Sequence, residues 1–597
     1  YLRMDYSIPS RANIYASDGN ALVAQADAVA IGLDTGRVDL EYQESLLNLL
    51  YALTGIHPDT LGPRIDAWRP YGYYLPVADV SVEALANYEA ALAGYSGVIL
   101  QSFRTRYYFN EGIAPHVVGY MSLIQPDEVD IYRRLGYRID ERVGRDGLEY
   151  WGEQYLAGQR GGTLYVVAAD GSIITTLSER APQPAEAVYT TINYDLQLKL
   201  QRSNALSDGM LGAIVVIEVD TGRVLAMLSS PGFNPNLFEP SNYNFSYLIN
   251  DLYAPTTPLL NRATQGQYPL GSVFKIITIS AALQSGLYTQ DSEYECGYFF
   301  EEIPGHTPND WTYDHFLEDG RTQPSGLLTL PQGLMRSCNP WFWHIGLDFY
   351  NRGMYTAIAD MARAFGLGSP TGIEIGEEAG AMPEPVNNID AINLAIGQGD
   401  SLVTPLQVAN FVAAVGNGGT LYQPRVIDRI LPVTGDPTYV FTPVVRGTLP
   451  ISPENLTILQ QAMYSVVMNP RGTAYRSGTF GLNSFVSNTG IPIYGKTGTA
   501  EAGYGDSHAW FAGYSDANRE NKPDIAVAVL VENGGEGSDI AAPIFRRVME
   551  IYFQGAAQIR YPWEALVGVV ATPTPLVTDT PTLEETATPE GTATVAP

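Results

Sequence analysis

IYGKTGTA at residues 493–500, AWFAGY at 509–514 and IAVAVLV at 525–531 are the runs of sequence that decide the fold. Each has the length of a β-strand and is rich in β-branched or aromatic residues. The stretches between them contain Gly, Ser, Asp and Asn, which favour tight reversals of the chain. The three runs therefore predict successive antiparallel strands, with the chain returning from the first strand through Trp510 and Phe511.

A further pair of strands is expected far upstream, in GAIVVIEVDTGRVLAML at residues 212–228. Apolar positions alternate on both sides of Asp220-Thr221-Gly222, which is typical of a β-hairpin. Strands at both ends of this region, with helices between them, predict an α+β domain. We expect one antiparallel sheet with helices packed on both sides.

The helices expected between and after these strands follow from apolar residues at helical spacing. They are predicted over residues 273–283, 330–349, 354–365, 404–415, 453–467 and 540–553. The last of them is expected to be capped by Ser538-Asp539 and to end before Gly555.

The chain before this domain has a different character. A Pro-containing break, APQPAE at 181–186, separates the first 185 residues from the rest of the chain. Within them, Asp18-Gly19 is expected to turn between two short strands, and residues 44–54 and 82–92 have helical periodicity. No catalytic set gathers here, so a structural or docking domain of mixed α/β character is expected over 1–185. The Thr/Pro-rich end lacks aromatic residues, and 557–597 is interpreted as a linker and disordered tail after a 186–556 domain.

Composition excludes several classes of function. Among 597 residues the formal net charge is −30, which disfavours nucleic acid and anionic lipid surfaces as partners. Two cysteines are too few for a disulfide scaffold, and the six histidines form no close i, i+4 pair, so neither a metal nor another cofactor is expected. No apolar run reaches the ~18–20 residues that span a bilayer. Because the first residue is Tyr, we expect an upstream signal or anchor to be missing from this sequence.

Lys496-Thr497-Gly498-Thr499 is the most specific chemical signal. The chain contains only Lys199, Lys275, Lys496 and Lys522 as lysines, so a Lys-Thr-Gly is a rare event in it. On an edge strand, this motif offers a cation and hydroxyls beside backbone that glycine leaves open to a ligand. The pattern suits a substrate that carries a carboxylate.

Two further motifs precede it in the chain. Ser272-Val273-Phe274-Lys275 follows a Pro-Leu-Gly turn, so Ser272 starts a helix and Lys275 lies one turn later on the same face. A serine is a weak nucleophile, and a lysine can act as its base if desolvation lowers the lysine pKa towards neutrality. Ser337-Cys338-Asn339 lies between the other motifs, near the start of a helix. All three in this order indicate one active site.

These motifs resemble those of the penicillin-binding protein transpeptidases, which share S-x-x-K, S-x-N and K-T-G. The resemblance to class B members extends to YPLGSVFK, RSCNPWFWHIG, AIGQGDSLVTPLQVAN, GKTGTAE and HAWFAGY. In the N-terminal part, RANIYASDGNALVA, RYYFNEGIAPHVVGY and VGRDGLEYWGEQYLAGQRGG resemble the non-catalytic pedestal, or dimerisation-type, domain of that class. The implied fold is a penicillin-binding, serine β-lactamase-like transpeptidase domain preceded by an elongated pedestal.

The resemblance implies a peptidoglycan D,D-transpeptidase that acts on stem peptides ending in D-Ala-D-Ala. Ser272 would be the nucleophile and Lys275 its base, while Ser337 relays a proton and Asn339 binds the peptide amide. Lys496 and the substrate-binding Thr497, Gly498 and Thr499 would receive the terminal carboxylate, and the backbone N–H groups of Ser272 and Thr499 would hold the oxyanion. β-Lactams would acylate the serine.

The resemblance also implies a cellular location, and the sequence differs from the family pattern at a few positions. The expected setting is the outer side of the cell membrane, among other cell-wall synthesis proteins, with the membrane anchor outside this sequence. Arg11-Ala12 stands where the family usually has Arg-Gly, and Val273 where it has Thr. The segment WRPYGYYLPVADVS at 68–81 looks closest to the low-affinity, resistance-type branch.

Alternatives remain open from the sequence. A D,D-carboxypeptidase uses the same groups with water as acceptor, and a serine β-lactamase would need a dedicated hydrolytic Glu, which is not evident. A β-lactam sensor lacks support, and a non-catalytic cell-wall scaffold would normally have lost one of the motif residues. Cys338 is interpreted as a small buried residue rather than a reactive thiol. Its pairing with Cys296, the acceptor amine and a septal or elongation role are left undecided.

Overall fold

A computed structural model describes residues 1–561 except 203–205, 207–208 and 504. Two compact units are present among them: Tyr1–Ala26 together with the chain from Arg104 onward, and Asp27–Phe103. Most of the expected tail lies outside the described residues. No helix among the described residues is both long and apolar enough to cross a membrane.

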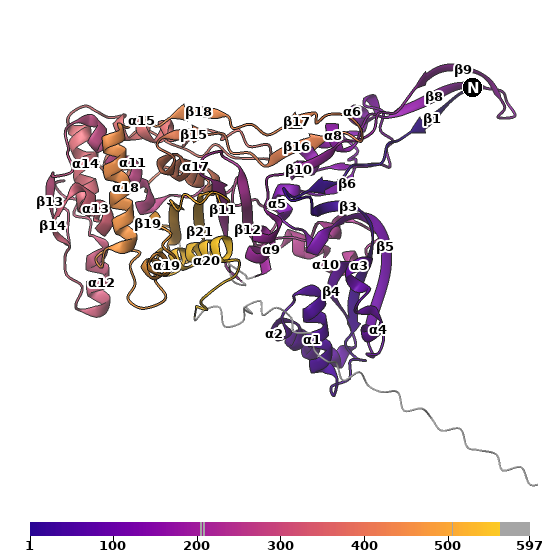
Figure 1. The fold of residues 1–597 in the computed structure, drawn as a ribbon, viewed down its shortest axis with the longest axis horizontal. Helices are drawn as coiled ribbons and strands as arrows, with labels where there is room; N and C mark the ends of the chain where they lie inside the picture. The colour runs from indigo at the N-terminus through magenta and orange to yellow at the C-terminus, as the bar shows by residue number, and fades with distance from the viewer. Residues whose placement is uncertain (203–205, 207–208, 504, 562–597) are drawn as a thin grey trace, which may run out of the picture. The chain divides into compact units, whose positions relative to one another are not determined.

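A five-stranded antiparallel sheet forms the centre of the larger unit (Figure 1). In spatial order its strands are β12 (Val224–Ser230), β11 (Gly212–Glu218), β21 (Ile525–Val531), β20 (His508–Ser515) and β19 (Ile493–Ala500). The predicted strands are confirmed, and the strand that carries Lys-Thr-Gly lies at the edge. Register is set by pairs such as Lys496 with Ala512 and Phe511 with Val529.

Helices cover both faces of this sheet. Successive residues of a strand point to opposite faces, and on β21 the residues on both faces are apolar. On β21, Ala526, Ala528 and Leu530 pack in one core with helix α17 (Pro405–Gly416). The residues between them pack in a second core with α20 (Ala541–Gln554) and α19 (Leu482–Thr489). There Phe545 is fully buried and its ring lies 4.6 Å from that of Phe511. Burying such a side chain stabilises the fold by roughly 2–3 kcal/mol.

The prediction of one continuous helix over 330–349 is wrong. The chain forms α13 (Leu330–Arg336) and α14 (Asn339–Asn351), separated at Ser337 and Cys338. Ser337 has φ 57°, a left-handed conformation that ends α13, and Pro340 is suited to the first turn of a new helix.

The remaining predicted helices agree within a few residues. They are η5 (Gly271–Phe274) continuing into α11 (Lys275–Ser285), α15 (Ala357–Ala364), α17, α18 (Pro453–Met468) and α20. The expected cap of α20 is wrong: the helix begins after Ile540 without a side-chain cap. Asp539 instead forms an ion pair with Arg476.

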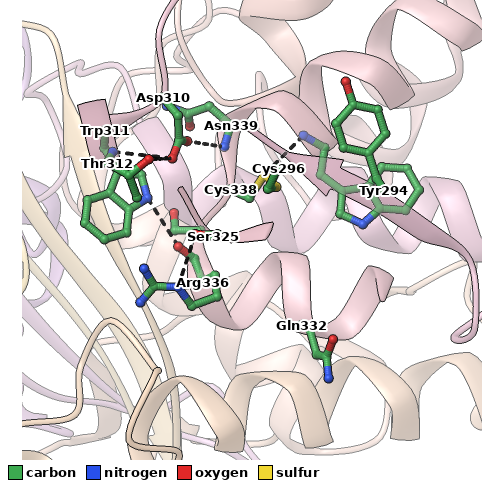
Figure 2. The surroundings of a disulfide bond; sticks show 12 residues. Tyr294, Cys296, Asp310, Trp311, Thr312, Ser325, Gln332, Arg336, Cys338 and Asn339 are labelled. Atoms are coloured by element: carbon green, nitrogen blue, oxygen red, sulfur yellow. Dashed lines mark hydrogen bonds between the residues drawn. A yellow bond between two sulfur atoms is a disulfide. The ribbon is translucent and has the colours of Figure 1, made fainter. Parts of the chain in front are cut away.

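A disulfide joins Cys296 to Cys338, with the two Cα atoms 6.4 Å apart (Figure 2). It connects β13 (Glu293–Cys296), which pairs with β14 (Gly326–Thr329), to the start of α14. Both residues are fully buried, so the expectation of a packed rather than reactive Cys338 agrees with the structure. Its sulfur also accepts a hydrogen bond from the Trp341 N–H at 3.3 Å, which caps α14.

The N-terminal segment shares a sheet with the C-terminal half of the larger unit. Strand β2 (Ile14–Tyr15) pairs with the start of β3 (Ala21–Asp34) and, in parallel, with β10 (Ala187–Thr190). Strand β10 then pairs with β16 (Ile427–Leu431), which continues to β17 (Tyr439–Val440). A separate sheet contains β1 (Leu2–Ser7), β8 (Gly161–Val167) and β9 (Ile173–Arg180).

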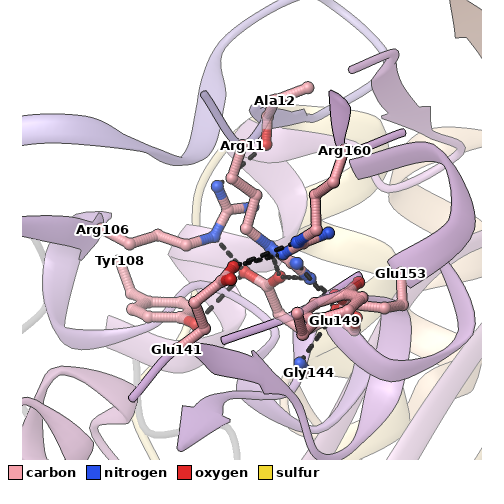
Figure 3. Close-up of polar contacts among 10 residues, drawn as sticks. Arg11, Ala12, Arg106, Tyr108, Glu141, Gly144, Glu149, Glu153 and Arg160 are labelled. Carbon is pink, nitrogen blue, oxygen red and sulfur yellow. Dashed lines mark hydrogen bonds and ion pairs between the residues drawn. The ribbon is translucent and has the colours of Figure 1, made fainter. Parts of the chain in front are cut away.

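A buried ion-pair cluster holds the N-terminal segment in place (Figure 3). Glu149, on α7 (Gly147–Trp151), is inaccessible to solvent, and its Oε2 accepts from Arg11 Nη2 at 2.7 Å. Its other oxygen pairs with Arg106. Burial alone would raise the pKa of Glu149, but the two guanidinium groups hold it below its ordinary value.

Shorter elements connect these parts of the larger unit. They are η2 (Phe109–Glu111), α5 (Pro115–Val118), β6 (Met121–Leu123), α6 (Val129–Arg134), β7 (Arg142–Gly144), α8 (Glu153–Leu156), α9 (Tyr194–Arg202), η3 (Pro235–Phe238), α10 (Phe245–Leu248), η4 (Ile249–Tyr253), α12 (Trp311–Asp319), α16 (Asn388–Ala395), β15 (Thr420–Tyr422) and β18 (Val445–Thr448).

The smaller unit has a core of its own. The later part of β3 pairs with β4 (Tyr74–Ser81), and the core also receives α1 (Gln43–Thr54) and α2 (Pro58–Trp68). Further short elements are η1 (Arg69–Tyr71) and the start of β5 (Val98–Tyr108). The helix predicted over 44–54 is confirmed as α1. The helix predicted over 82–92 divides into α3 (Val82–Leu85) and α4 (Glu89–Leu92), at a turn containing Asn87, a residue that competes with helical hydrogen bonds.

Candidate active site

Ser272 lies in the 3-10 turn η5, directly before α11. Gly271 precedes it with φ 57°, and a Cβ there would lie 2.5 Å from the carbonyl oxygen of Thr499. Only glycine therefore lets the turn approach β19 so closely. The Pro269 carbonyl oxygen also accepts from the indole N–H of Trp510 on β20 at 3.0 Å. Ser272 is thus placed beside the Lys-Thr-Gly strand and is half-buried.

Lys275 begins α11 and is completely buried. Its Nζ donates to Asn339 Oδ1 at 2.6 Å, to the Ser337 carbonyl oxygen at 2.7 Å and to Ser337 Oγ at 3.3 Å. Burial lowers the pKa of Lys275 to about 7, although the negative charge of Asp310 acts in the opposite direction. At neutral pH this lysine can therefore both hold and release a proton.

Lys496 approaches the same serine hydroxyl from the sheet. Its side chain is also fully buried, and its Nζ donates to Ser337 Oγ and to the Thr497 carbonyl oxygen, both at 2.9 Å. Burial, and then the charge of Lys275, lowers its pKa well below the ordinary value. Ser337 Oγ therefore lies between two lysine nitrogens from separate elements.

The Lys-Thr-Gly part of β19 carries two threonines with different surroundings. Thr497 Oγ1 shares a hydrogen bond with Thr473 Oγ1 at 2.7 Å, and Thr499 is exposed. Gly498 packs tightly, since a Cβ there would lie 2.9 Å from Val273 Cγ2. The expectation of backbone left open at Gly498 is therefore wrong: this glycine is buried against Val273 and Trp510, and Thr499 is the exposed residue of the motif.

Sequence reasoning missed three supporting residues. Asp310 caps α12, and its Oδ1 accepts from the backbone N–H of Asn339 at 2.9 Å. Thr473 holds Thr497, and the N–H of Gly537 donates to Thr499 Oγ1 at 3.4 Å. Asp before Trp311-Thr312 is a recognisable helix-start signal. Its contact with a motif residue 29 positions later is not visible in the sequence.

The structure brings all of the motif residues expected from the sequence to one place. Among the described residues, no group of three or more His, Cys, Asp or Glu could hold a metal ion. A half-buried serine beside a lysine with a near-neutral pKa, a second serine and an edge strand with an exposed Thr499 can transfer an acyl group. The fold and this site define the class: serine acyltransferases of the penicillin-binding type.

Comparisons with known proteins give the family. A profile described as "Penicillin binding protein transpeptidase domain" matches residues 212–550, and one described as "Penicillin-binding Protein dimerisation domain" matches residues 6–190. The chain belongs to the penicillin-binding protein transpeptidase family. With its dimerisation domain it is a class B member, a serine-type D,D-transpeptidase.

Relatives and solved structures agree along most of the chain. The peptidoglycan D,D-transpeptidase MrdA of Escherichia coli strain K12 is 27% identical over 592 residues, covering 93% of this chain and 88% of the relative. A chain in a solved peptidoglycan synthase complex has 27% identity and a TM-score of 0.65, covering 94% of this chain and 93% of that one. The Helicobacter pylori PBP2, solved in complex with MreC, has 22% identity and a TM-score of 0.65, covering 93% and 100%, and supports the fold alone.

Proposed function

We propose that this transpeptidase cross-links peptidoglycan stem peptides ending in D-Ala-D-Ala through an acyl-enzyme on Ser272. The observation that carries the proposal is the position of Ser337 Oγ, 3.3 Å from Lys275 Nζ and 2.9 Å from Lys496 Nζ. A hydroxyl between two buried amines can pass a proton from one step of the reaction to the next.

In the first half-reaction, neutral Lys275 takes the proton of Ser272 as Oγ forms a bond to the penultimate D-Ala carbonyl carbon. The backbone N–H groups of Ser272 and Thr499 stabilise the oxyanion. The peptide C–N bond then breaks, and Ser337 delivers the proton from Lys275 to the leaving amine. The terminal D-Ala departs, and Ser272 remains as an ester.

Substrate orientation rests on the edge strand and on Asn339. The terminal carboxylate is received by Lys496, Thr497 and Thr499. Asn339 donates its amide to the peptide while its Oδ1 holds Lys275. In the second half-reaction an amine from a neighbouring stem bonds to the ester carbonyl carbon and loses a proton to Lys275. The bond from this carbon to Ser272 Oγ then breaks, and Lys275 returns the proton to Oγ.

The first test is acylation by a fluorescent penicillin, read by denaturing gel and intact mass. The native chain is expected to form a stable one-to-one adduct that maps to Ser272, and Ser272→Ala should form none. Ser285→Ala, a serine on the same helical segment, is the matched control and should label normally. An adduct on Ser272→Ala would contradict the assignment.

Product analysis with a stem-peptide substrate tests the acceptor. A cross-linked dimer in the presence of an acceptor amine supports a transpeptidase. Release of D-Ala with only hydrolysed peptide would instead indicate a D,D-carboxypeptidase. Rapid turnover of penicillin without a stable adduct would indicate a β-lactamase.

The setting is proposed from the substrate and the relatives. Peptidoglycan lies outside the cytoplasmic membrane, so the enzyme is expected to act there with other cell-wall synthesis proteins. Support comes from the chain of 27% identity that was solved in a peptidoglycan synthase complex. Co-purification from detergent-solubilised membranes tests this part.

A further inference from the structure

An ion pair joins two parts of the chain that support opposite sides of the site. His315 Nε2 lies 2.6 Å from Glu536 Oε1, although the residues are 221 positions apart. His315 is on α12, and Glu536 lies in the loop between β21 and α20. Their side chains are 33% and 42% exposed, so neither is required for the core.

On the α12 side, His315 is connected to the Ser337–Asn339 turn. Asp310 caps this helix through Thr312 and also accepts from the backbone N–H of Asn339 (Figure 2). The ring of Trp311 meets that of His315 edge-on at 5.2 Å. Its indole N–H donates to the carbonyl oxygen of Arg336, the residue directly before Ser337, at 3.3 Å.

On the other side, Glu536 is connected to the Lys-Thr-Gly strand. Gly537 follows it and donates to Thr499 Oγ1 at 3.4 Å. This glycine also lies directly on the strand, because a Cβ there would be 2.2 Å from the Gly498 carbonyl oxygen. The residue that follows Glu536 is therefore in direct contact with the strand that faces Ser272.

We propose that His315 and Glu536 are positioning residues: their ion pair holds the Lys-Thr-Gly strand and the Ser337–Asn339 turn at the spacing needed for acylation. The inference rests on the proposed function of these two motifs. Neither residue contacts the reacting atoms, so the pair acts through Gly537 and Asp310. A half-exposed ion pair has an interaction free energy of up to about 1 kcal/mol. If this free energy were lost in the transition state for acylation, the rate would change about fivefold.

The strength of the ion pair depends on pH, because His315 must be protonated to carry a positive charge. Burial lowers the pKa of His315, but the hydrogen bond and charge of Glu536, with the charges of Glu318 and Asp319, raise it overall above the ordinary value. The pair is therefore intact below this raised pKa and weakens as pH increases through it.

The test measures the second-order rate constant of acylation by a fluorescent penicillin. His315→Gln and Glu536→Gln are expected to lower it about two- to fivefold at about pH 6, with little change in Tm. His315→Arg keeps a positive charge towards Glu536 and should restore the native rate. The ratio of native to His315→Arg rate should then fall between about pH 6 and about pH 9, because only the native residue loses its charge. Titration of Lys275 affects both proteins equally and cancels in this ratio.

The chain offers a matched control. His344 Nδ1 lies 2.9 Å from Glu302 Oε2, with side chains 32% and 37% exposed, and this pair contacts neither motif side chain. His344→Gln should leave the rate within about twofold of native. Native rates in His315→Gln at all pH values, or a loss in His344→Gln of the same size, would overturn the proposal. Failure of the proposed function would differ, since Ser272→Ala would then still be labelled.

Discussion

At the scale of single residues, burial decides the chemistry of the two motif lysines. Lys275 and Lys496 are ordinary cations in the sequence, but both are fully buried in the structure and share one serine hydroxyl. Two adjacent ammonium groups in a medium of low polarity cannot both keep ordinary pKa values. The base that activates Ser272 is therefore a product of packing.

The pKa of Lys275, lowered to about 7, predicts the pH dependence of acylation. Because the base must be neutral, the rate should fall about tenfold per pH unit below pH ~7 and level off above it. Asp310→Asn removes a charge that raises this pKa, so the midpoint should move to lower pH. Asp314→Asn, an exposed change on the same helix, should leave it in place. A midpoint that stays constant or rises in Asp310→Asn would contradict this account.

At the scale of secondary structure elements, two close contacts set the geometry of the site. One is the loop at Gly537 against β19, and the other is the disulfide at the start of α14. Each joins segments distant in sequence, and each ends beside a motif residue. Changes at these contacts should therefore affect acylation and stability together.

Gly537→Ala tests the first contact. Its Cβ would lie 2.2 Å from the Gly498 carbonyl oxygen and 2.3 Å from that of Trp510, so the loop or the strand must move. We expect a loss of about 1–3 kcal/mol in stability and slower acylation. Gly447→Ala, where no atom lies within 4 Å of the new Cβ, is the control and should change neither. Chemical denaturation and penicillin labelling measure the two effects.

Reduction of the Cys296–Cys338 disulfide tests the second contact. The bond closes a separation of 42 residues, for which loop-closure entropy gives about 3–4 kcal/mol of stabilisation. Urea unfolding with and without reductant should differ by up to this amount. A Cys296→Ser variant should show the reduced stability in both conditions; a variant as stable as the oxidised native chain would disprove the contribution.

At the scale of the whole molecule, the catalytic chemistry and the core of residues 27–103 belong to separate compact units. The smaller unit builds its core from α1, α2 and the strands beside them. None of its residues belongs to the motif set.

Leu50→Ala tests this independence. Leu50 is fully buried in the smaller core, so the change should destabilise that unit by about 2–5 kcal/mol. The penicillin acylation rate at 25 °C, measured by labelling, should equal the native rate. Hydrogen exchange of the smaller unit measures its loss of stability. Leu40→Ala, at a residue 71% exposed in the same unit, should affect neither quantity. Slower acylation in Leu50→Ala, with a native rate in Leu40→Ala, would show that the acylation rate depends on the stability of the smaller unit.

Local patterns were sufficient for the elements of the catalytic part. The strand-like runs at 493–500, 509–514 and 525–531 predicted the sheet, and the Pro-Leu-Gly turn predicted the start of the helix at Ser272. The tight packing of Gly498 was not predicted, because it depends on contacts with Val273 and Trp510. The break at Ser337 was not predicted, because the apolar spacing of α13 and α14 continues across it and the left-handed conformation is imposed by tertiary contacts. For the same reason the cap of α20 was assigned to residues that pair elsewhere.

The sequence by itself determined which chemical groups are available: a serine with a lysine one turn later, a Ser-x-Asn and a Lys-Thr-Gly on a strand. These are short-range patterns, and their order along the chain is sufficient to group them. Only the tertiary structure decided the pKa of Lys275, the disulfide at Cys338, the support from Asp310 and the His315–Glu536 pair. Those properties depend on burial and on contacts between residues tens to hundreds of positions apart, which local spacing does not encode.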